Sequence, residues 1–205
     1  MNRSLRNSSV RDNAIELKNK KKLRQPMFEQ FRYRVGISYS RFHFRTSEQQ
    51  AIRWTGAVSD AQHALLLLPE SPQDSASLRS IVEFFQRQFT PSHLLIVGTV
   101  ESATRLALDR RAQLVTFAPS DMNAWFVPRG ELTQKVKKST FDVAVDLNLD
   151  LALPSAYLCR ASGARIRVGF NKQHADTFYN FLVQPHQTNN FGAACNSLTN
   201  CLQMF

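Results

Sequence analysis

Short apolar runs alternate with helical patterns from Ala64 to the end of the chain. Five runs are rich in apolar residues, at 64–70, 93–99, 112–118, 141–148 and 164–170. The first two, "ALLLLPE" and "HLLIVGT", contain continuous apolar stretches rather than an alternating pattern. A central strand of a parallel sheet has this pattern because helices cover both of its faces. The runs therefore predict buried parallel strands.

Helical spacing fills the intervals between these runs. In "SPQDSASLRSIVEFFQRQF" the apolar residues recur every three or four positions, and Asp74 or Ser75 is available as the N-cap. Further helices are predicted at 101–109, 131–139, 153–162 and 191–205, the third with Pro154 in its first turn. Alternating strands and helices with right-handed crossovers build a doubly wound sheet. We therefore predict a Rossmann-like, mostly parallel α/β domain of about five to six strands over residues 47–205.

Residues 1–46 have a different pattern and form what we call the N-terminal extension. The segment "DNAIELKNKKKLRQ" contains helix formers and ends at residue 25, where Pro26 stops a helix. Beyond it, aromatic and aliphatic residues alternate with arginine, glycine and serine from Phe31 to Ser40. A period of two predicts an extended segment with one apolar and one basic side.

Charge separates the extension from the rest of the chain. The formal net charge is +10, and residues 1–45 contain 12 Lys+Arg against 3 Asp+Glu. Such a basic block predicts a polyanionic partner, either nucleic acid or an anionic membrane surface, although a solvated basic tail would have the same composition. No apolar run reaches the roughly 18 residues that span a bilayer, so we expect no stable membrane insertion.

The same features favour a cytoplasmic location. The start of the chain has no apolar core of a secretory signal, although an Arg- and Ser-rich organellar transit peptide would look similar. Three cysteines, Cys159, Cys195 and Cys201, form no CxxC pair, which suits a reducing compartment. The sequence indicates no oligomeric state.

Motifs for a cofactor or a metal are missing from the predicted strand ends. The loop "PESPQDSAS" after the first strand has no glycine, so it is neither a dinucleotide-binding turn nor a P-loop. Asp146, Asn148 and Asp150 are spaced as in a calcium loop, but Leu151 and Tyr157 stand where that loop needs Gly and Glu. We expect no cofactor, no metal and no catalytic residue, with Asp74 as only a weak candidate. His174 and Asp176 have no nucleophile near them in a known motif.

The segment "TFDVAVDLNLDLALPSAYLCRASGARIRVGF", Thr140 to Phe170, resembles the segment that closes the N-terminal half of the ADP-heptose glycosyltransferase (heptosyltransferase, GT-B) family. The resemblance implies a Rossmann-like half-domain. The family has a Gly-Asp pair after its first strand, whose Asp is the candidate base, and Asp74 matches it loosely with Gln73 in place of the glycine. Because the chain ends at Phe205, where the donor-binding domain would begin, the resemblance implies ancestry and fold more than activity.

The chain also resembles short bacterial proteins that place a Lys-rich N-terminal helix before this half-domain alone. They share an "NAWF"-like stretch, here within Met122 to Phe126. No activity follows from this second resemblance.

These features lead to one principal function and two alternatives. We expect a non-catalytic, ribosome-associated RNA-binding protein, with ribosomal RNA and ribosomal proteins as partners. The residues expected to contact phosphates are Lys18, Lys20, Lys21, Lys22, Arg24, Arg32, Arg34, Arg41 and Arg45. The aromatic residues of the extension, Phe31, Tyr33, Phe42 and Phe44, would either stack on unpaired bases or form the buried face of an added edge strand, and we favour the buried face.

The alternatives use other parts of the chain. One is a glycosyltransferase-like acceptor domain, alone or with a separate donor-domain subunit, in which Asp74 is the base. The other is a membrane-surface protein that inserts Phe28 and Phe31 among anionic lipids.

Overall fold

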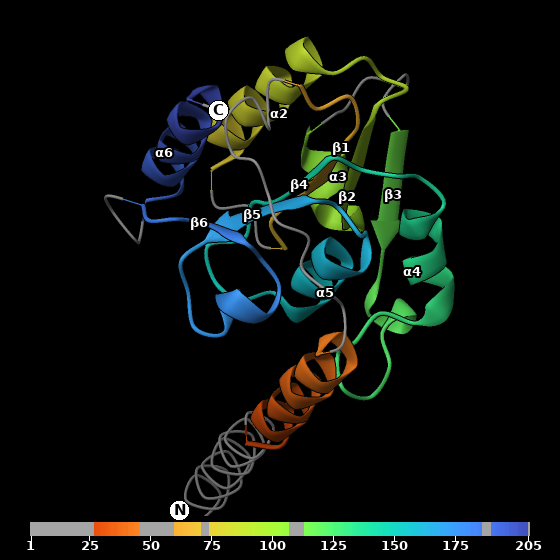
Figure 1. The fold of residues 1–205 in the computed structure, drawn as a ribbon. Helices are drawn as coiled ribbons and strands as arrows, with labels where there is room; N and C mark the ends of the chain where they lie inside the picture. Colours follow the sequence, from red (N-terminus) through yellow and green to blue (C-terminus); the bar gives the residue numbers. More distant parts are fainter. Residues whose placement is uncertain (1–26, 46–59, 71–73, 107–112, 186–189, 205) are drawn as a thin grey trace, which may run out of the picture.

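Six parallel strands form the centre of the protein (Figure 1). The computed structural model describes residues 27–45, 60–70, 74–106, 113–185 and 190–204. The strands are β1 (Ala64–Leu67), β2 (Leu94–Thr99), β3 (Gln113–Phe117), β4 (Val143–Asp146), β5 (Ile166–Phe170) and β6 (Phe181–Val183). They lie in the order β3-β2-β1-β4-β5-β6, and every neighbouring pair is parallel. The predicted doubly wound α/β fold is confirmed, and β1 to β5 coincide with the five apolar runs.

Helices cover both faces of this sheet, which explains why its central strands are apolar throughout. On one face, α2 (Ser75–Gln88) packs beside α6 (Phe191–Gln203), and on the other α4 (Gly130–Lys137) packs beside α5 (Leu153–Ala161). The short α3 (Val100–Leu106) connects β2 to β3. Successive residues of β1 point to opposite faces, so Leu66 joins the α2/α6 core while Leu65 and Leu67 join the α4/α5 core.

Two single-turn 3-10 helices complete the described elements. The first, Pro119–Asp121, follows β3, and the second, Ala175–Thr177, lies between β5 and β6. Both stand at the carboxyl edge of the sheet, by which we mean the edge where the parallel strands end.

Residues 27–44 form a helix, so the prediction of an extended segment there is wrong. Tyr33, Ile37, Ser40 and Phe44 follow one another at helical spacing, and this stripe faces the α4/α5 core. The apolar positions between Phe31 and Ser40 also fit the strand period of two, because over a short segment some positions satisfy both this period and the helical period of 3.6. Tertiary packing of the helical stripe decides between them.

The rest of the extension lies outside the described residues. This applies to the predicted helix up to residue 25, to Lys18, Lys20, Lys21, Lys22 and Arg24, and to the proposed boundary between residues 46 and 47.

Candidate functional site

The N-terminal helix (residues 27–44) lies across the carboxyl edge of the sheet (Figure 1). It is held by the loops that follow β3, β4 and β5. Arg32 Nε donates to the backbone oxygen of Ala124 after β3, and the Tyr33 hydroxyl donates to the backbone oxygen of Leu151 after β4. Arg41 Nε donates to Thr177 Oγ1 after β5, at 3.2 Å. The helix is therefore anchored to the domain along most of its length.

The loop that contains the "NAWF" stretch forms the main surface on which this helix packs. The side-chain oxygen of Asn123 accepts from the backbone N–H groups of Trp125, at 2.8 Å, and of Val127, at 3.1 Å, which fixes the loop as an Asx turn. Phe126 has φ +59°, a left-handed conformation that a bulky residue rarely adopts. Its ring lies under the Arg32 guanidinium, 4.6 Å from centroid to Cζ. The stretch thus has a structural role, because the N-terminal helix packs against it.

Gly36 allows the helix to approach this loop closely. A Cβ atom at this position would lie 2.1 Å from the backbone oxygen of Trp125 and 2.6 Å from Leu153 Cδ2. Only a residue without a side chain fits there, so the glycine is a packing requirement in a helix that would otherwise favour alanine.

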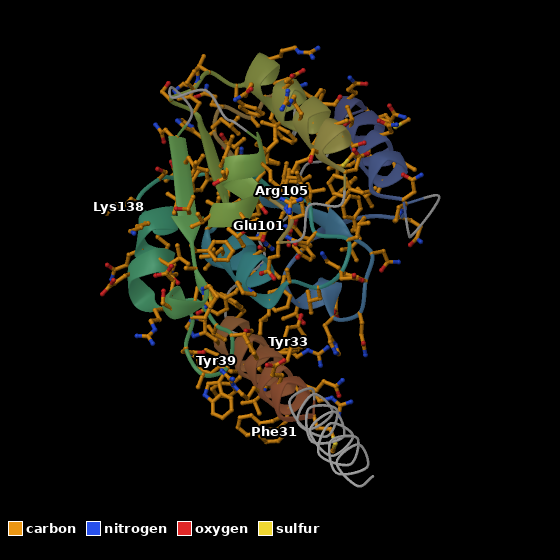
Figure 2. All side chains as sticks on the ribbon, turned by 180° about the vertical axis from the view of Figure 1, so that it is seen from behind. Phe31, Tyr33, Tyr39, Glu101, Arg105 and Lys138 are labelled. Atoms are coloured by element: carbon orange, nitrogen blue, oxygen red, sulfur yellow. The ribbon has the colours of Figure 1, made fainter. Side chains whose placement is uncertain are left out.

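The outward side of the helix carries an exposed aromatic stripe, which we define as Phe28, Phe31, Tyr39 and Phe42. Their exposed fractions are 65%, 59%, 46% and 77%. Figure 2 shows Phe31 on the side of the helix turned away from the sheet. The expectation that the aromatics of the extension form one buried face is wrong, because the helix divides them: Tyr33 and Phe44 face the domain and the stripe faces outward.

Four of the five arginines predicted to contact nucleic acid lie among the described residues, and they have two different environments. Arg34, Arg41 and Arg45 follow one side of the aromatic stripe, and all three are exposed. Arg32 lies on the other side of the stripe, is half-buried, and is used in docking. Arg41 also helps to dock the helix, since its Nη2 lies 3.1 Å from His174 Nδ1 as well as bonding Thr177. Within the described ranges, Arg34 and Arg45 make no ion pair or hydrogen bond with another side chain.

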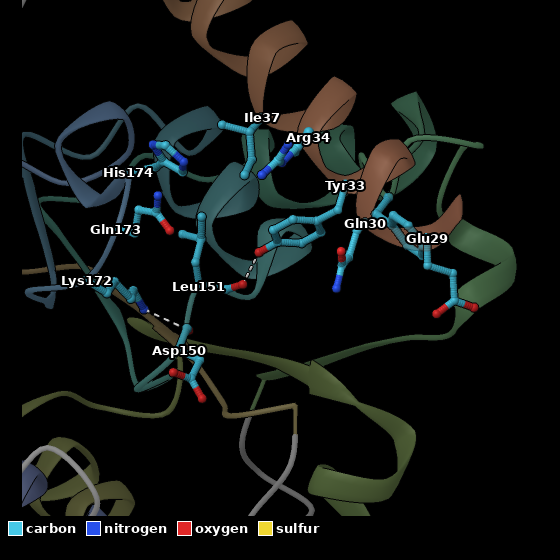
Figure 3. A pocket seen from close by; sticks show the side chains of 11 residues that line it. Glu29, Gln30, Tyr33, Arg34, Ile37, Asp150, Leu151, Lys172, Gln173 and His174 are labelled. Carbon is cyan, nitrogen blue, oxygen red and sulfur yellow. Dashed lines mark hydrogen bonds between the residues drawn. The ribbon is translucent and has the colours of Figure 1, made fainter. Parts of the chain in front are cut away.

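A cavity of about 870 Å³ separates part of the helix from the loops after β4 and β5 (Figure 3). Side chains from both sides line it, among them Gln30, Arg34, Lys172, Gln173 and His174. Lys172 spans its floor by donating to the backbone oxygens of Asn148 and Asp150. Burial lowers the pKa of Lys172, while Asp146 and Asp150 act against that decrease.

Behind this cavity, a buried polar network occupies the end of β4. Asp146 is fully buried and accepts hydrogen bonds from the Tyr179 hydroxyl and from both nitrogens of Asn148, at 3.0 Å from the backbone and 2.6 Å from the side chain. Burial first, and then Asp146, raises the pKa of Tyr179. The phenol therefore stays protonated and donates to the carboxylate, so the network is a satisfied structural unit.

Glu70 differs from Asp146 in the surroundings of one of its carboxylate oxygens. It follows β1, and its backbone N–H donates to Asn148 Oδ1 at 2.9 Å. Its Oε1 atom is buried and, among the described residues, has no hydrogen-bond partner. Burial, and to a lesser extent Asp146, raises the pKa of Glu70. Because β1 and β4 are neighbours at the point where the strand order reverses, Glu70 stands where open α/β sheets bind their ligands.

Asp74, the weak catalytic candidate, is the N-cap of α2. Its side chain accepts from the backbone N–H groups of Ala76 and Ser77 and from the Ser77 hydroxyl. The Ser77 hydrogen bonds lower the pKa of Asp74, which makes it a poorer base. The hydrogen bonds of Asp74 are those of a helix N-cap. The hypothesis of a glycosyltransferase-like acceptor domain stays a prediction.

No group of three or more His, Cys, Asp or Glu side chains in the described ranges is arranged to hold a metal ion. No helix within them has the length and apolar character needed to cross a bilayer. Comparisons with protein-family models, with curated proteins and with solved structures found no match.

Sequence reasoning singled out the arginines and missed Glu70. The available signal was an acidic residue directly after a continuous apolar strand. Its importance depends on the strand order, because only the β1–β4 pairing brings Glu70 beside Asn148 and Asp146.

Proposed function

We propose that this chain is a non-catalytic RNA-binding protein whose N-terminal helix is the RNA-contacting surface and whose α/β domain is the platform. The observation that carries the proposal is the exposed aromatic stripe bordered by arginines on a helix that is held to the domain through Arg32 and Arg41. The domain itself is close to neutral, so the positive field belongs to the extension.

The aromatic stripe supplies a means of holding unpaired bases. Stacking of a base on an aromatic side chain contributes about 1–3 kcal/mol and tolerates any base, because every base has a π face. Large exposed aromatics are otherwise unfavourable on a surface. Stacking partners for Phe28, Phe31 and Phe42 therefore explain why the helix keeps them in water.

The arginines supply contacts to the phosphates of the same strand. Arg34, Arg41 and Arg45 are spaced by seven and four residues, so they form one row beside the aromatic stripe. The predicted lysine cluster at 18–22 would lengthen this basic track. An RNA strand that follows this row of arginines also passes the cavity of Figure 3. Gln30 and Gln173 line that cavity together with Arg34, and their amide groups are suited to hydrogen bonds with base edges.

The proposal predicts salt-sensitive binding of single-stranded RNA by the full-length chain. With about six phosphate contacts, log K falls against log salt with a slope of about −4 to −5. Fluorescence anisotropy of a labelled RNA oligomer between about 50 and 500 mM salt measures this slope. Ribosomal particles in the same buffers, followed by co-sedimentation, test association with the ribosome.

Variants separate the two kinds of contact. The triple change Phe28→Ala, Phe31→Ala and Phe42→Ala should weaken binding at least tenfold and leave the slope unchanged, since it removes stacking but no charge. The double change Arg34→Ala and Arg45→Ala should reduce the slope by about 1 to 2. Arg79→Ala with Arg87→Ala, on the exposed side of α2, is the matched control. A slope near zero contradicts the proposal, as does flotation with anionic liposomes in the absence of RNA binding.

A further inference from the structure

Glu70 stands between two cavities that open at the carboxyl edge of the sheet. The larger cavity, of about 400 Å³, lies between the loops after β1 and β3 and the first turns of α3 and α5. The smaller, of about 180 Å³, lies between the loops after β1 and β4 and the start of α6. Both are separate from the outward surface of the N-terminal helix, so a ligand site in either cavity is independent of RNA binding.

The unpartnered oxygen of Glu70 is the first indication of a ligand. Nearly all buried polar atoms in proteins have a hydrogen-bond partner, and a buried carboxylate oxygen without one is costly. The neighbouring Asp146 shows the usual solution, with three donors on its two oxygens. Glu70 Oε1 is instead one of three buried side-chain nitrogen or oxygen atoms without a partner among the described residues.

The walls of the larger cavity are the second indication. Its lining is mainly apolar and comes from several elements: Val100, Phe117, Met122, Phe126 and Pro154. A cavity of this volume holds a small molecule, and apolar walls with a few polar groups are typical of such sites. Phe126 is held in its left-handed conformation here, and conformations of this kind cluster at binding sites.

Charge decides which small molecule fits. The described lining includes two acids, Glu70 and Glu101, and neither Lys nor Arg. Glu101 already pairs with Arg105, 2.6 Å away on the same helix (Figure 2). Glu70 is therefore the uncompensated carboxylate of this lining, and a cation with donor hydrogens would neutralise it and donate to it.

We propose that the larger cavity, which Glu70 lines, binds a primary amine on an apolar body of about the size of one ring, with the ammonium paired to the Glu70 carboxylate. The body lies between Phe117, Met122 and Pro154. An anion of the same shape is repelled by the Glu70 carboxylate. An alcohol of the same shape binds more weakly, because it donates one hydrogen bond and brings no charge.

Three probes of one shape test this site on the full-length chain: 2-phenylethylammonium, 2-phenylethanol and 3-phenylpropionate. Ligand-observed NMR titration gives their relative affinities, and thermal unfolding gives an independent readout. The ammonium should bind and raise the melting temperature. The alcohol should bind roughly tenfold more weakly, and the carboxylate should not bind, since a hydrogen bond between charged groups exceeds a neutral one by about this much.

Two variants locate the binding. Glu70→Gln should remove the preference for the ammonium over the alcohol, whereas Glu83→Gln, at an exposed glutamate of α2, should keep it. Val100→Phe fills the mouth of the cavity from a side chain that is 56% exposed, so it should block every probe without disturbing the fold. The proposal is overturned if the ammonium does not bind, if the three probes bind equally, or if Glu70→Gln keeps the preference.

Discussion

Two carboxyl groups at the same edge of the sheet have opposite surroundings, and this difference sets their chemistry. Asp146 is stabilised by Tyr179 and Asn148. Glu70 has its backbone fixed by the same asparagine but keeps one side-chain oxygen buried with no partner in the part of the chain that the structure describes. A group in the second situation costs stability in its charged form and is available to bind.

The raised pKa of Glu70 predicts that its contribution to folding stability decreases as the pH rises. Its folded-state pKa lies above that of the unfolded chain, so its favourable contribution is complete below the unfolded value of about 4.3 and is lost as the pH rises through the folded value. Glu70→Gln should therefore unfold at the same temperature as the wild type near pH 4. It should unfold at a higher temperature at pH 8. Thermal unfolding across this range measures the difference.

Glu83→Gln provides the comparison for that experiment, because it makes the same change at an exposed position of α2. If the Glu70→Gln protein is less stable than the wild type at pH 8, then the Glu70 side chain has a partner that stabilises its charge, and the reasoning about this residue fails.

At the scale of elements, the docking of the N-terminal helix depends on one close contact with the "NAWF" loop. Gly36→Ala raises the intrinsic helix propensity by about 1 kcal/mol, so it should stabilise a helix that merely lies in solvent. In this structure the added methyl group would overlap the backbone oxygen of Trp125. We therefore predict that Gly36→Ala lowers the melting temperature and increases hydrogen exchange of the backbone amides at 33–44.

The sign of the effect makes this prediction decisive. Ser38→Ala, at an exposed position of the same helix, should change stability by no more than about 0.5 kcal/mol. A Gly36→Ala protein that is more stable than the wild type would mean that the helix does not pack on the loop.

The elements also show how far the sequence could predict the structure. The strands were predictable because apolar runs such as 64–68 have no polar face, which only a doubly covered parallel sheet accommodates. The N-terminal helix was not, because Tyr33, Val35, Ile37 and Tyr39 satisfy a period of two, while its real partners, Trp125 and Leu153, are about a hundred residues away. Local patterns cannot specify such long-range packing.

The candidate sites were also predictable to different degrees, because one depends on local composition and the other on long-range strand order. The arginines of the extension are visible in any count of charge, and Arg34 and Arg45 are exposed as a solvated basic surface requires. Glu70 is one acidic residue among 16 until the strand order places it at the point of reversal. Composition finds a charged surface, whereas a buried site needs the topology.

At the scale of the whole molecule, two apolar cores share one sheet, and each contains a buried cysteine. Cys195 belongs to the α2/α6 core and Cys159 to the α4/α5 core. Burial raises the pKa of Cys159 and raises that of Cys195 to about 12, so neither forms the reactive thiolate in the folded protein. Cys201 is partly exposed.

These positions predict the order of thiol labelling. Cys201 should react first with a thiol reagent at pH 8, and Cys159 and Cys195 should react much more slowly and at one common rate. A common rate is expected because the sheet couples both cores into a single cooperative unit. Mass spectrometry of peptides after timed labelling measures the three rates. Rapid labelling of Cys195 with Cys159 protected would show that the α2/α6 layer opens independently.

The placement of the N-terminal helix has a consequence for any two-lobed assembly. Enzymes with two facing lobes close over the carboxyl edges of their parallel sheets, and here the loops after β3, β4 and β5 are already engaged by residues 27–44. A second lobe could reach those loops only after displacing the helix. The helix and such a lobe would therefore compete for one surface, and the helix holds the advantage because its tether gives it a high effective concentration there.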